Sequence, residues 1–218
     1  ALSTEAAPKH EYTTAGTYNV QLVTTAGLCS DTLTMAITTS GLTMGFMQDT
    51  TEICKNDAIQ FQDTSKIKAG TKWQYIWDFG DGSPIDTVYT DITSHQFTKD
   101  GNFTVKLQIV TAGGCTDSIK KVNEFTVNAL PQITTLSADV TDGCAPLATN
   151  FTLAATSLVP IKSYSWNFGD GTAASSDQNP SHTYTIAGSY DVTATVTDDK
   201  NCSLDSTKIK YINPTFPA

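Results

Sequence analysis

The sequence predicts an all-β protein built from tandem antiparallel β-sandwiches in an extended array. Two nearly identical stretches, WDFGDGS at 77–83 and WNFGDGT at 166–172, lie 89 residues apart, which is roughly the length of a small β domain. Apolar and polar residues alternate in runs such as 103–109 and 190–197, as expected for strands with one face on a core and one in water. No segment carries the apolar stripe of a helix.

The repeat also sets the expected domain boundaries. A His-x-aromatic-x-x-x-Gly-x-aromatic signature begins at His10, His95 and His182. Turn-forming residues recur about every ten positions, so each complete repeat should hold roughly seven strands. We expect the C-terminal half of a repeat at 1–40, complete repeats at 41–129 and 130–214, and the start of a linker to a further repeat at 215–218. Short junctions that contain proline should keep the array stiff.

Composition excludes several classes of protein. Asp and Glu number 22 against 13 Lys and Arg, a net charge of −9, and every basic residue is lysine. An acidic chain without arginine repels nucleic acid and lacks the forked donor that reads bases. No apolar run is long enough to span a bilayer, and the N-terminus does not read as a signal peptide. We therefore expect a mature or excised soluble segment.

Five cysteines indicate an oxidising, extracellular location. The repeat register predicts that Cys54 pairs with Cys115 and Cys144 with Cys202, each within one repeat, and that the partner of Cys29 is absent from this chain. A bridge that closes a loop of about 60 residues stabilises by about 4 kcal/mol. The alternative is five free, buried thiols. No Cys-x-x-Cys spacing is present, which argues against zinc.

The Trp-x-Phe-Gly-Asp-Gly stretches predict a core strand that ends in a tight turn. Their aromatic residues share one side of a strand and should fill the core against the disulfide: Trp77 and Phe79, then Trp166 and Phe168. The glycines take positive φ without steric cost, and Asp81 and Asp170 can bond the backbone of their own turns.

Metal binding is the alternative for these polar residues. Calcium would need several converging oxygens, for which the second repeat offers Asp78, Asp81 and Asp86 but the third repeat offers no equal set. His95 and His182 are expected to bond the backbone at a strand entrance. Tyr12 and Tyr184 resemble corner tyrosines, whose hydroxyls bond the main chain. We expect no cofactor.

The joint motif of the Trp-x-Phe-Gly-Asp-Gly turn and the His-x-aromatic signature resembles the PKD (polycystic kidney disease) domain. This resemblance covers both complete repeats and the N-terminal fragment, and it implies an immunoglobulin-like, extracellular and non-enzymatic module. The cysteine pattern further resembles PKD arrays on the surface of bacteria that use type IX secretion, including adhesins of gliding cells. Asn167 departs from the motif, because its counterpart is Asp78.

These patterns favour a disulfide-locked stalk or spacer in adhesion within a secreted or cell-surface protein. No serine-nucleophile, zinc-protease or phosphate-loop motif supports an enzyme. Neighbouring repeats of the same or an adjacent chain are the expected partners, with surface polysaccharide or protein as further candidates. No nucleic acid and no direct membrane span are expected.

Two alternatives remain open for the function. One is a carbohydrate- or protein-binding accessory domain of a secreted hydrolase, for which Trp73 is the candidate stacking residue. The other is a subunit of an extracellular filament, in which a neighbouring chain completes residues 1–40. Five Asp-Ser/Thr-x triplets also resemble the Asp-Ser/Thr-apolar signal for bacterial O-glycosylation, with acceptors at Thr32, Thr50, Thr87, Ser118 and Ser206.

Overall fold

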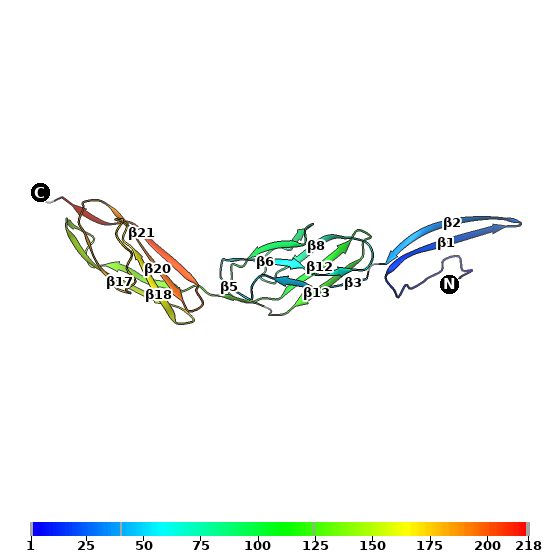
Figure 1. Cartoon of the computed structure of the whole chain (residues 1–218), viewed down its shortest axis with the longest axis horizontal. Coiled ribbons are helices and arrows are strands. Elements are labelled where there is room, and N and C mark those ends of the chain that lie inside the picture. The colour runs from blue at the N-terminus through cyan, green and yellow to red at the C-terminus, as the bar shows by residue number, and fades with distance from the viewer. Residues whose placement is uncertain (1, 40, 124, 217–218) are drawn as a thin grey trace. The chain divides into compact units, whose positions relative to one another are not determined.

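The computed structural model describes residues 2–39, 41–123 and 125–216, and the described chain contains strands and no helix. It divides into two compact units, each assembled from segments that are not continuous in the sequence. The first unit holds Ala1–Thr51, Ala58–Gln96 and Asn102–Phe125; the second holds Glu52–Asp57, Phe97–Gly101 and Thr126–Ala218. The predicted all-β class is confirmed. Figure 1 shows the strands.

The first unit contains most of the strands that precede residue 125. They are β1 (Gly16–Ala26), β2 (Cys29–Thr39), β3 (Leu42–Thr43), β4 (Phe46–Gln48), β6 (Ala58–Asp63), β7 (Lys66–Ile67), β8 (Lys72–Asp78), β9 (Asp86–Val88), β10 (Ile92–Gln96), β12 (Val105–Thr111) and β13 (Thr116–Lys121). The short strand β11 (Gly101–Asn102) falls at the division between the units.

Strands β1 and β2 form a two-stranded antiparallel hairpin. Gly27 takes a φ of 62° in its two-residue loop, a conformation that glycine adopts without steric cost. The register places Leu22 opposite Leu33 and Val20 opposite Met35. Leu22, Leu33 and Met35 are 59%, 68% and 59% exposed. One face of this hairpin is therefore apolar and open to solvent.

The rest of the first unit contains a short two-stranded sheet of β3 and β7 and a sandwich whose two sheets have the strand orders β10-β6-β4 and β13-β12-β8-β9. Aromatic rings join the sheets across the core, since Trp77 on β8 lies 5.2 Å from Phe46 on β4 and 5.7 Å from Phe61 on β6. Along β12 the buried residues alternate as predicted: Val105, Leu107 and Ile109 are all buried.

The second unit contains a second sandwich and two short strands of the earlier repeat. Its strands are β5 (Glu52–Cys54), β14 (Thr126–Asn128), β15 (Gln132–Ala138), β16 (Asp142–Cys144), β17 (Leu147–Thr156), β18 (Ile161–Asn167), β19 (Ser181–Tyr184), β20 (Tyr190–Asp198) and β21 (Ser203–Thr215). Its two main sheets have the orders β15-β17-β19 and β16-β21-β20-β18.

The core of this second sandwich forms around Trp166, which is fully buried. Phe151 on β17 lies 5.2 Å from Trp166 on β18, and Val192, Ala194 and Val196 pack from the inward face of β20, in the predicted alternation. The Trp166 indole N–H donates to the Asp177 carbonyl at 3.0 Å. Trp166 therefore combines a large apolar area with a satisfied polar atom.

Replacing Trp166 by alanine should destabilise the second sandwich by about 3 to 5 kcal/mol, because it leaves a large cavity and an unmatched carbonyl. Urea unfolding followed by circular dichroism measures this change. The matched control is Trp73→Ala, at a side chain that is 58% exposed, which should change stability by less than about 0.5 kcal/mol. Equal losses in the two variants would contradict the assigned core.

Candidate functional site

The Trp-x-Phe-Gly-Asp-Gly turns have the same geometry in both repeats. The side-chain oxygen of Asp78 accepts from the Gly80 N–H at 3.0 Å, and that of Asn167 accepts from the Gly169 N–H at 2.9 Å. An amide oxygen serves this bond as well as a carboxylate, which explains why asparagine replaces aspartate here. Gly80 and Gly169 take φ values of 74° and 80°, as the sequence predicts.

The second aspartate of each turn binds its own turn with one oxygen and a histidine with the other. Asp170 Oδ1 accepts from the Thr172 N–H at 3.1 Å and the Thr172 hydroxyl at 2.6 Å, and Oδ2 lies 2.7 Å from His182 Nε2. Asp81 repeats this arrangement with Ser83 and with His95, whose Nε2 lies 2.8 Å from Asp81 Oδ2. Both aspartates are therefore turn formers.

The predicted backbone bonds of His95 and His182 stay a prediction, and the structure adds a partner that the sequence did not suggest, since Nε2 of each ring meets an aspartate carboxylate. The motif phenylalanine holds the ring in place. His182 stacks on Phe168 with centroids 4.1 Å apart, and His95 stacks on Phe79 at 3.9 Å. The joint recurrence of Asp and His in both repeats is a sequence signal for this contact, but the stacking that directs the ring depends on three-dimensional packing.

The carboxylates in these turns are held ionised. Burial by itself raises the pKa of Asp170, but hydrogen bonds from Thr172 and His182 outweigh it and lower that pKa below its usual range. The pKa of Asp81 is lowered by the same balance of burial against bonds from Ser83 and His95. The arrangement is a structural clasp that joins the turn to the His-bearing strand.

The three calcium candidates do not converge into a recognisable site. Asp78 and Asp81 bind their own turn, while Asp86 Oδ2 accepts from the Thr93 hydroxyl at 2.8 Å. Within the described residues, no group of three or more His, Cys, Asp or Glu side chains is placed to hold a metal ion.

Of the two predicted corner tyrosines, Tyr184 makes the expected bond to the main chain, while a second kind of tyrosine bond is made by residues that were not predicted to make it. The Tyr184 hydroxyl donates to the Phe168 carbonyl at 3.1 Å, so it bonds the main chain across the core. The short return bond, from a tyrosine to the carbonyl four residues earlier, is made instead by Tyr18 to Thr14 at 2.5 Å and by Tyr190 to Ile186 at 2.9 Å. Tyr12 packs its ring 4.4 Å from that of Tyr18.

The structure contains one disulfide among the described residues, and it joins Cys54 to Cys202 with Cα atoms 5.5 Å apart. Both cysteines belong to the second compact unit. Glu52, two residues before Cys54, pairs with Lys200 at 2.7 Å and accepts from the Asn128 side-chain amide at 2.9 Å. The hydrogen bond from Lys200 and then that from Asn128 lower the pKa of Glu52. An ion pair thus accompanies the covalent bond.

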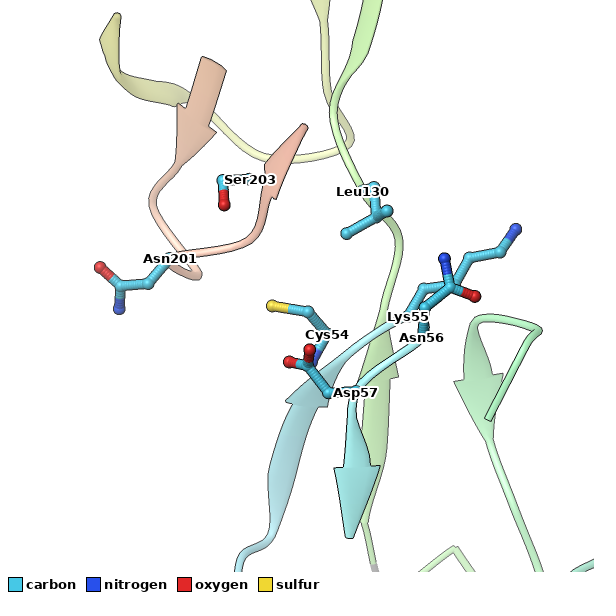
Figure 2. Close-up of a pocket in the computed structure, with 7 residues that line it drawn as sticks. All are labelled: Cys54, Lys55, Asn56, Asp57, Leu130, Asn201 and Ser203. Carbon is cyan, nitrogen blue, oxygen red and sulfur yellow. The ribbon is translucent and has the colours of Figure 1, made fainter. Parts of the chain in front are cut away.

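Figure 2 shows the surroundings of this bond, with the Cys54 sulfur directed towards the turn that carries Asn201 and Ser203. The pocket beside it is lined by seven residues: Cys54, Lys55, Asn56, Asp57, Leu130, Asn201 and Ser203. Backbone amides fix the loop after Cys54, because the Lys55 N–H donates to the Asn128 carbonyl at 2.8 Å and Asn56 N–H to the Phe97 carbonyl at 2.8 Å. These two bonds hold the backbone of the residues that directly follow Cys54.

The predicted pairs Cys54 with Cys115 and Cys144 with Cys202 are not those that the structure forms, so this prediction is corrected. The reason is clearest in the second sandwich. In the parallel pair of β16 and β21, Cys144 lies opposite Thr215 at the end of β21, whereas Cys202 directly precedes Ser203 at the start of β21. A strand of 13 residues spans about 40 Å, far beyond the reach of a disulfide. The tryptophans consequently do not pack against a bridge within their own sandwich.

The other predicted residues lie at the surface or in turns. Cys29 and Cys144 are exposed, and Cys115 is half-buried. Trp73 is exposed and meets Tyr89 edge to face at 6.0 Å. Of the glycosylation candidates, Thr32, Thr87 and Ser118 are exposed, whereas Thr50 and Ser206 are half-buried.

Comparison with known proteins identifies the modules. Residues 45–127 and 128–213 each match the PKD domain family. A segment of 43 residues is 56% identical to the pre-pro-metalloprotease PrtV of Vibrio cholerae serotype O1, covering 20% of this chain and 5% of that protein.

Two solved PKD domains are also similar. The PKD1 domain of Vibrio anguillarum Epp is 29% identical, covers 40% of this chain and 99% of that domain, and has a TM-score of 0.35. The PKD1 domain of the V. cholerae metalloprotease PrtV is 32% identical, covers 38% of this chain and 98% of that domain, and has a TM-score of 0.34.

The fold and the paired turns define a tandem immunoglobulin-like β-sandwich protein. With two matched segments that make up most of its length, the chain belongs to the PKD domain family.

Replacing Asp170 by alanine should lower stability by about 1 to 2 kcal/mol, because the bonds to Thr172 and His182 are lost. If Asp170 only forms the turn, its replacement should lower the thermal unfolding midpoint by the same amount with and without calcium. Asp177→Ala, at an exposed side chain nearby, is the matched control and should be close to neutral. If calcium raised the midpoint of the parent chain by several degrees and that of Asp170→Ala not at all, Asp170 would be a calcium ligand.

Proposed function

We propose that this chain is a non-catalytic spacer section of a secreted or cell-surface multidomain protein, in which linked PKD domains hold an adhesive or catalytic region away from its anchor. The observation that carries the proposal is the disulfide between Cys54, in the first matched PKD segment, and Cys202, in the second. A bond of this kind restrains one PKD domain against the next, which is what a stalk under load requires.

Extracellular placement is part of this proposal, and transport by type IX secretion is its most specific form. Disulfides persist in oxidising compartments, and the exposed positions of Cys29 and Cys144 suit a location where thiols find partners. In the part of the chain that the structure describes, no helix is long and apolar enough to cross a membrane. The non-catalytic role is supported by the Asp81 and Asp170 carboxylates, which both serve their turns and the adjacent histidine.

The mechanical role follows from the length of chain that the bond encloses. When the two ends of the chain are pulled, the segments before Cys54 and after Cys202 carry the load. The disulfide transmits that load directly, so the intervening chain, a sequence separation of 148, is not stretched. Backbone hydrogen-bond ladders resist extension of the outer strands, and the disulfide then limits how far the array can lengthen.

Single-molecule stretching from the two termini tests this role. Reducing the disulfide, or replacing Cys54 by serine, should increase the contour length of the fully extended chain by about 500 Å. The increase arises because the 148 residues enclosed by the bond can then be extended, at up to about 3.5 Å each. Cys29→Ser, at an exposed cysteine outside the bond, is the control and should leave the length unchanged. A contour length that does not respond to reduction would remove the basis of the proposed function.

A second candidate function is binding of surface polysaccharide, favoured by the exposed rings of Trp73 and Tyr89. They are 58% and 65% exposed and meet edge to face, and flat aromatic faces are suited to stacking on sugars. If the site is used, titration with polysaccharides from the cell envelope should quench tryptophan fluorescence, and Trp73→Ala should abolish the change while Val122→Ala, also at an exposed apolar residue, keeps it. An unchanged response in Trp73→Ala would exclude this site.

A further inference from the structure

We propose that Cys144 is the attachment point for a further PKD domain, and that its thiol forms a disulfide with the cysteine which that following domain carries at the Cys202 position. The bond between Cys54 and Cys202 is then one member of a series that links each domain to the next. The inference rests on the geometry around these cysteines and does not depend on the role proposed above.

The backbone around Cys144 repeats that around Cys54. Cys54 ends the three-residue strand β5, which pairs in parallel with β14 and sets Asn128 opposite Cys54. Cys144 ends the three-residue strand β16, which pairs in parallel with β21 and sets Thr215 opposite Cys144. Both strands begin with a carboxylate, Glu52 or Asp142.

The residue after each cysteine is held in the same way. The Lys55 N–H donates to the Asn128 carbonyl at 2.8 Å, and the Ala145 N–H donates to the Thr215 carbonyl at 2.8 Å. The backbone that aims Cys54 at its partner is therefore also present at Cys144. The difference is that Cys144 is exposed and takes no part in the disulfide that the structure contains.

The acceptor position is likewise a repeated feature of the domain. Cys202 closes a turn in which the Asn201 N–H donates to the Asp198 carbonyl at 2.9 Å and the Cys202 N–H to the Asp198 carboxylate at 3.0 Å. In the preceding domain, Gly114 N–H donates to the Thr111 carbonyl at 2.9 Å and Cys115 N–H to the Thr111 hydroxyl at 3.1 Å. Each complete domain thus presents a cysteine at this turn.

The direction of the link follows from the bond already formed. Cys54 is bonded to a cysteine 148 residues later in the sequence, which lies in the next matched domain. Cys202 is already bonded and lies at the opposite end of β21 from Cys144. A PKD domain that follows residue 218 in the same register is the partner that fits Cys144.

The chemistry is a two-electron oxidation. The two thiols lose two protons and two electrons as the S–S bond forms, and a disulfide oxidant such as oxidised glutathione takes them up and becomes two thiols. The reaction runs by exchange: the Cys144 thiolate attacks glutathione disulfide and releases one glutathione, and the second cysteine then displaces the other.

The test uses the full chain followed by a second copy of residues 132–218, placed directly after Ala218. This junction keeps the repeat register. The added Cys202 lies as many residues after Thr215 as the original Cys202 lies after Asn128. Two changes in the added copy make the map unambiguous: Cys144→Ser removes its spare thiol, and Thr207→Ser marks its cysteine peptide by mass. The protein is equilibrated in oxidised and reduced glutathione, denatured, alkylated and mapped without reduction.

We expect a peptide that links Cys144 to the marked Cys202, beside the bond from Cys54 to the original Cys202. Alkylation of Cys144 should fall about tenfold or more relative to the unextended chain, because tethering gives an effective concentration in the millimolar range. The matched control carries Cys202→Ser in the added copy and should restore alkylation of Cys144.

Three results would overturn the proposal. They are alkylation of Cys144 that is unchanged while the bond from Cys54 is intact, a disulfide-linked dimer between chains through Cys144, and a link from the marked cysteine to Cys29 or Cys115. The intact Cys54 bond reports that the chain has folded, so a failure to fold cannot be mistaken for any of them.

Discussion

The close approach of a turn glycine to a neighbouring strand is the constraint on which each sandwich depends. A Cβ atom on Gly80 would lie 2.4 Å from the Thr104 carbonyl oxygen, and one on Gly169 would lie 2.2 Å from the Asp191 carbonyl oxygen. Both glycines also need a positive φ, so no other residue fits without moving backbone. Because the turn is fixed here, the tryptophan before it enters the core and the aspartate after it meets the histidine.

The clasp between aspartate and histidine extends this constraint to a second strand. In the second sandwich, Asp170 sits in the turn after β18 and His182 on β19, and these strands belong to different sheets. The contact between the Asp170 carboxylate and His182 Nε2 and the stacking of His182 on Phe168 therefore link the sheets near the turn. Such a link needs all three side chains, which accounts for the joint recurrence of the Phe-Gly-Asp-Gly and His motifs.

Much of the fold could be predicted from the sequence, because it depends on local pattern. The inward positions Val105, Leu107 and Ile109 follow from alternation alone, and the turn glycines follow from their need for positive φ. The partner of His95 could not be predicted from alternation, since it depends on a ring stacked beneath it. The two tryptophans also differ in a way that no pattern reveals: the Trp166 N–H donates to the Asp177 carbonyl, while the buried Trp77 N–H has no hydrogen-bond partner among the described residues.

The disulfide shows why equivalence between repeats is a poor guide to pairing. Two cysteines recur in each complete repeat. Pairing within one domain and pairing between successive domains fit this recurrence equally well, because the sequence register is the same for both. Strand direction decides between them. Since β16 joins the end of β21 in parallel, Cys144 at the end of β16 lies remote from the turn that carries Cys202. A cysteine at one end and a cysteine at the other cannot close within a domain, but they can join one domain to another, as Cys54 and Cys202 do.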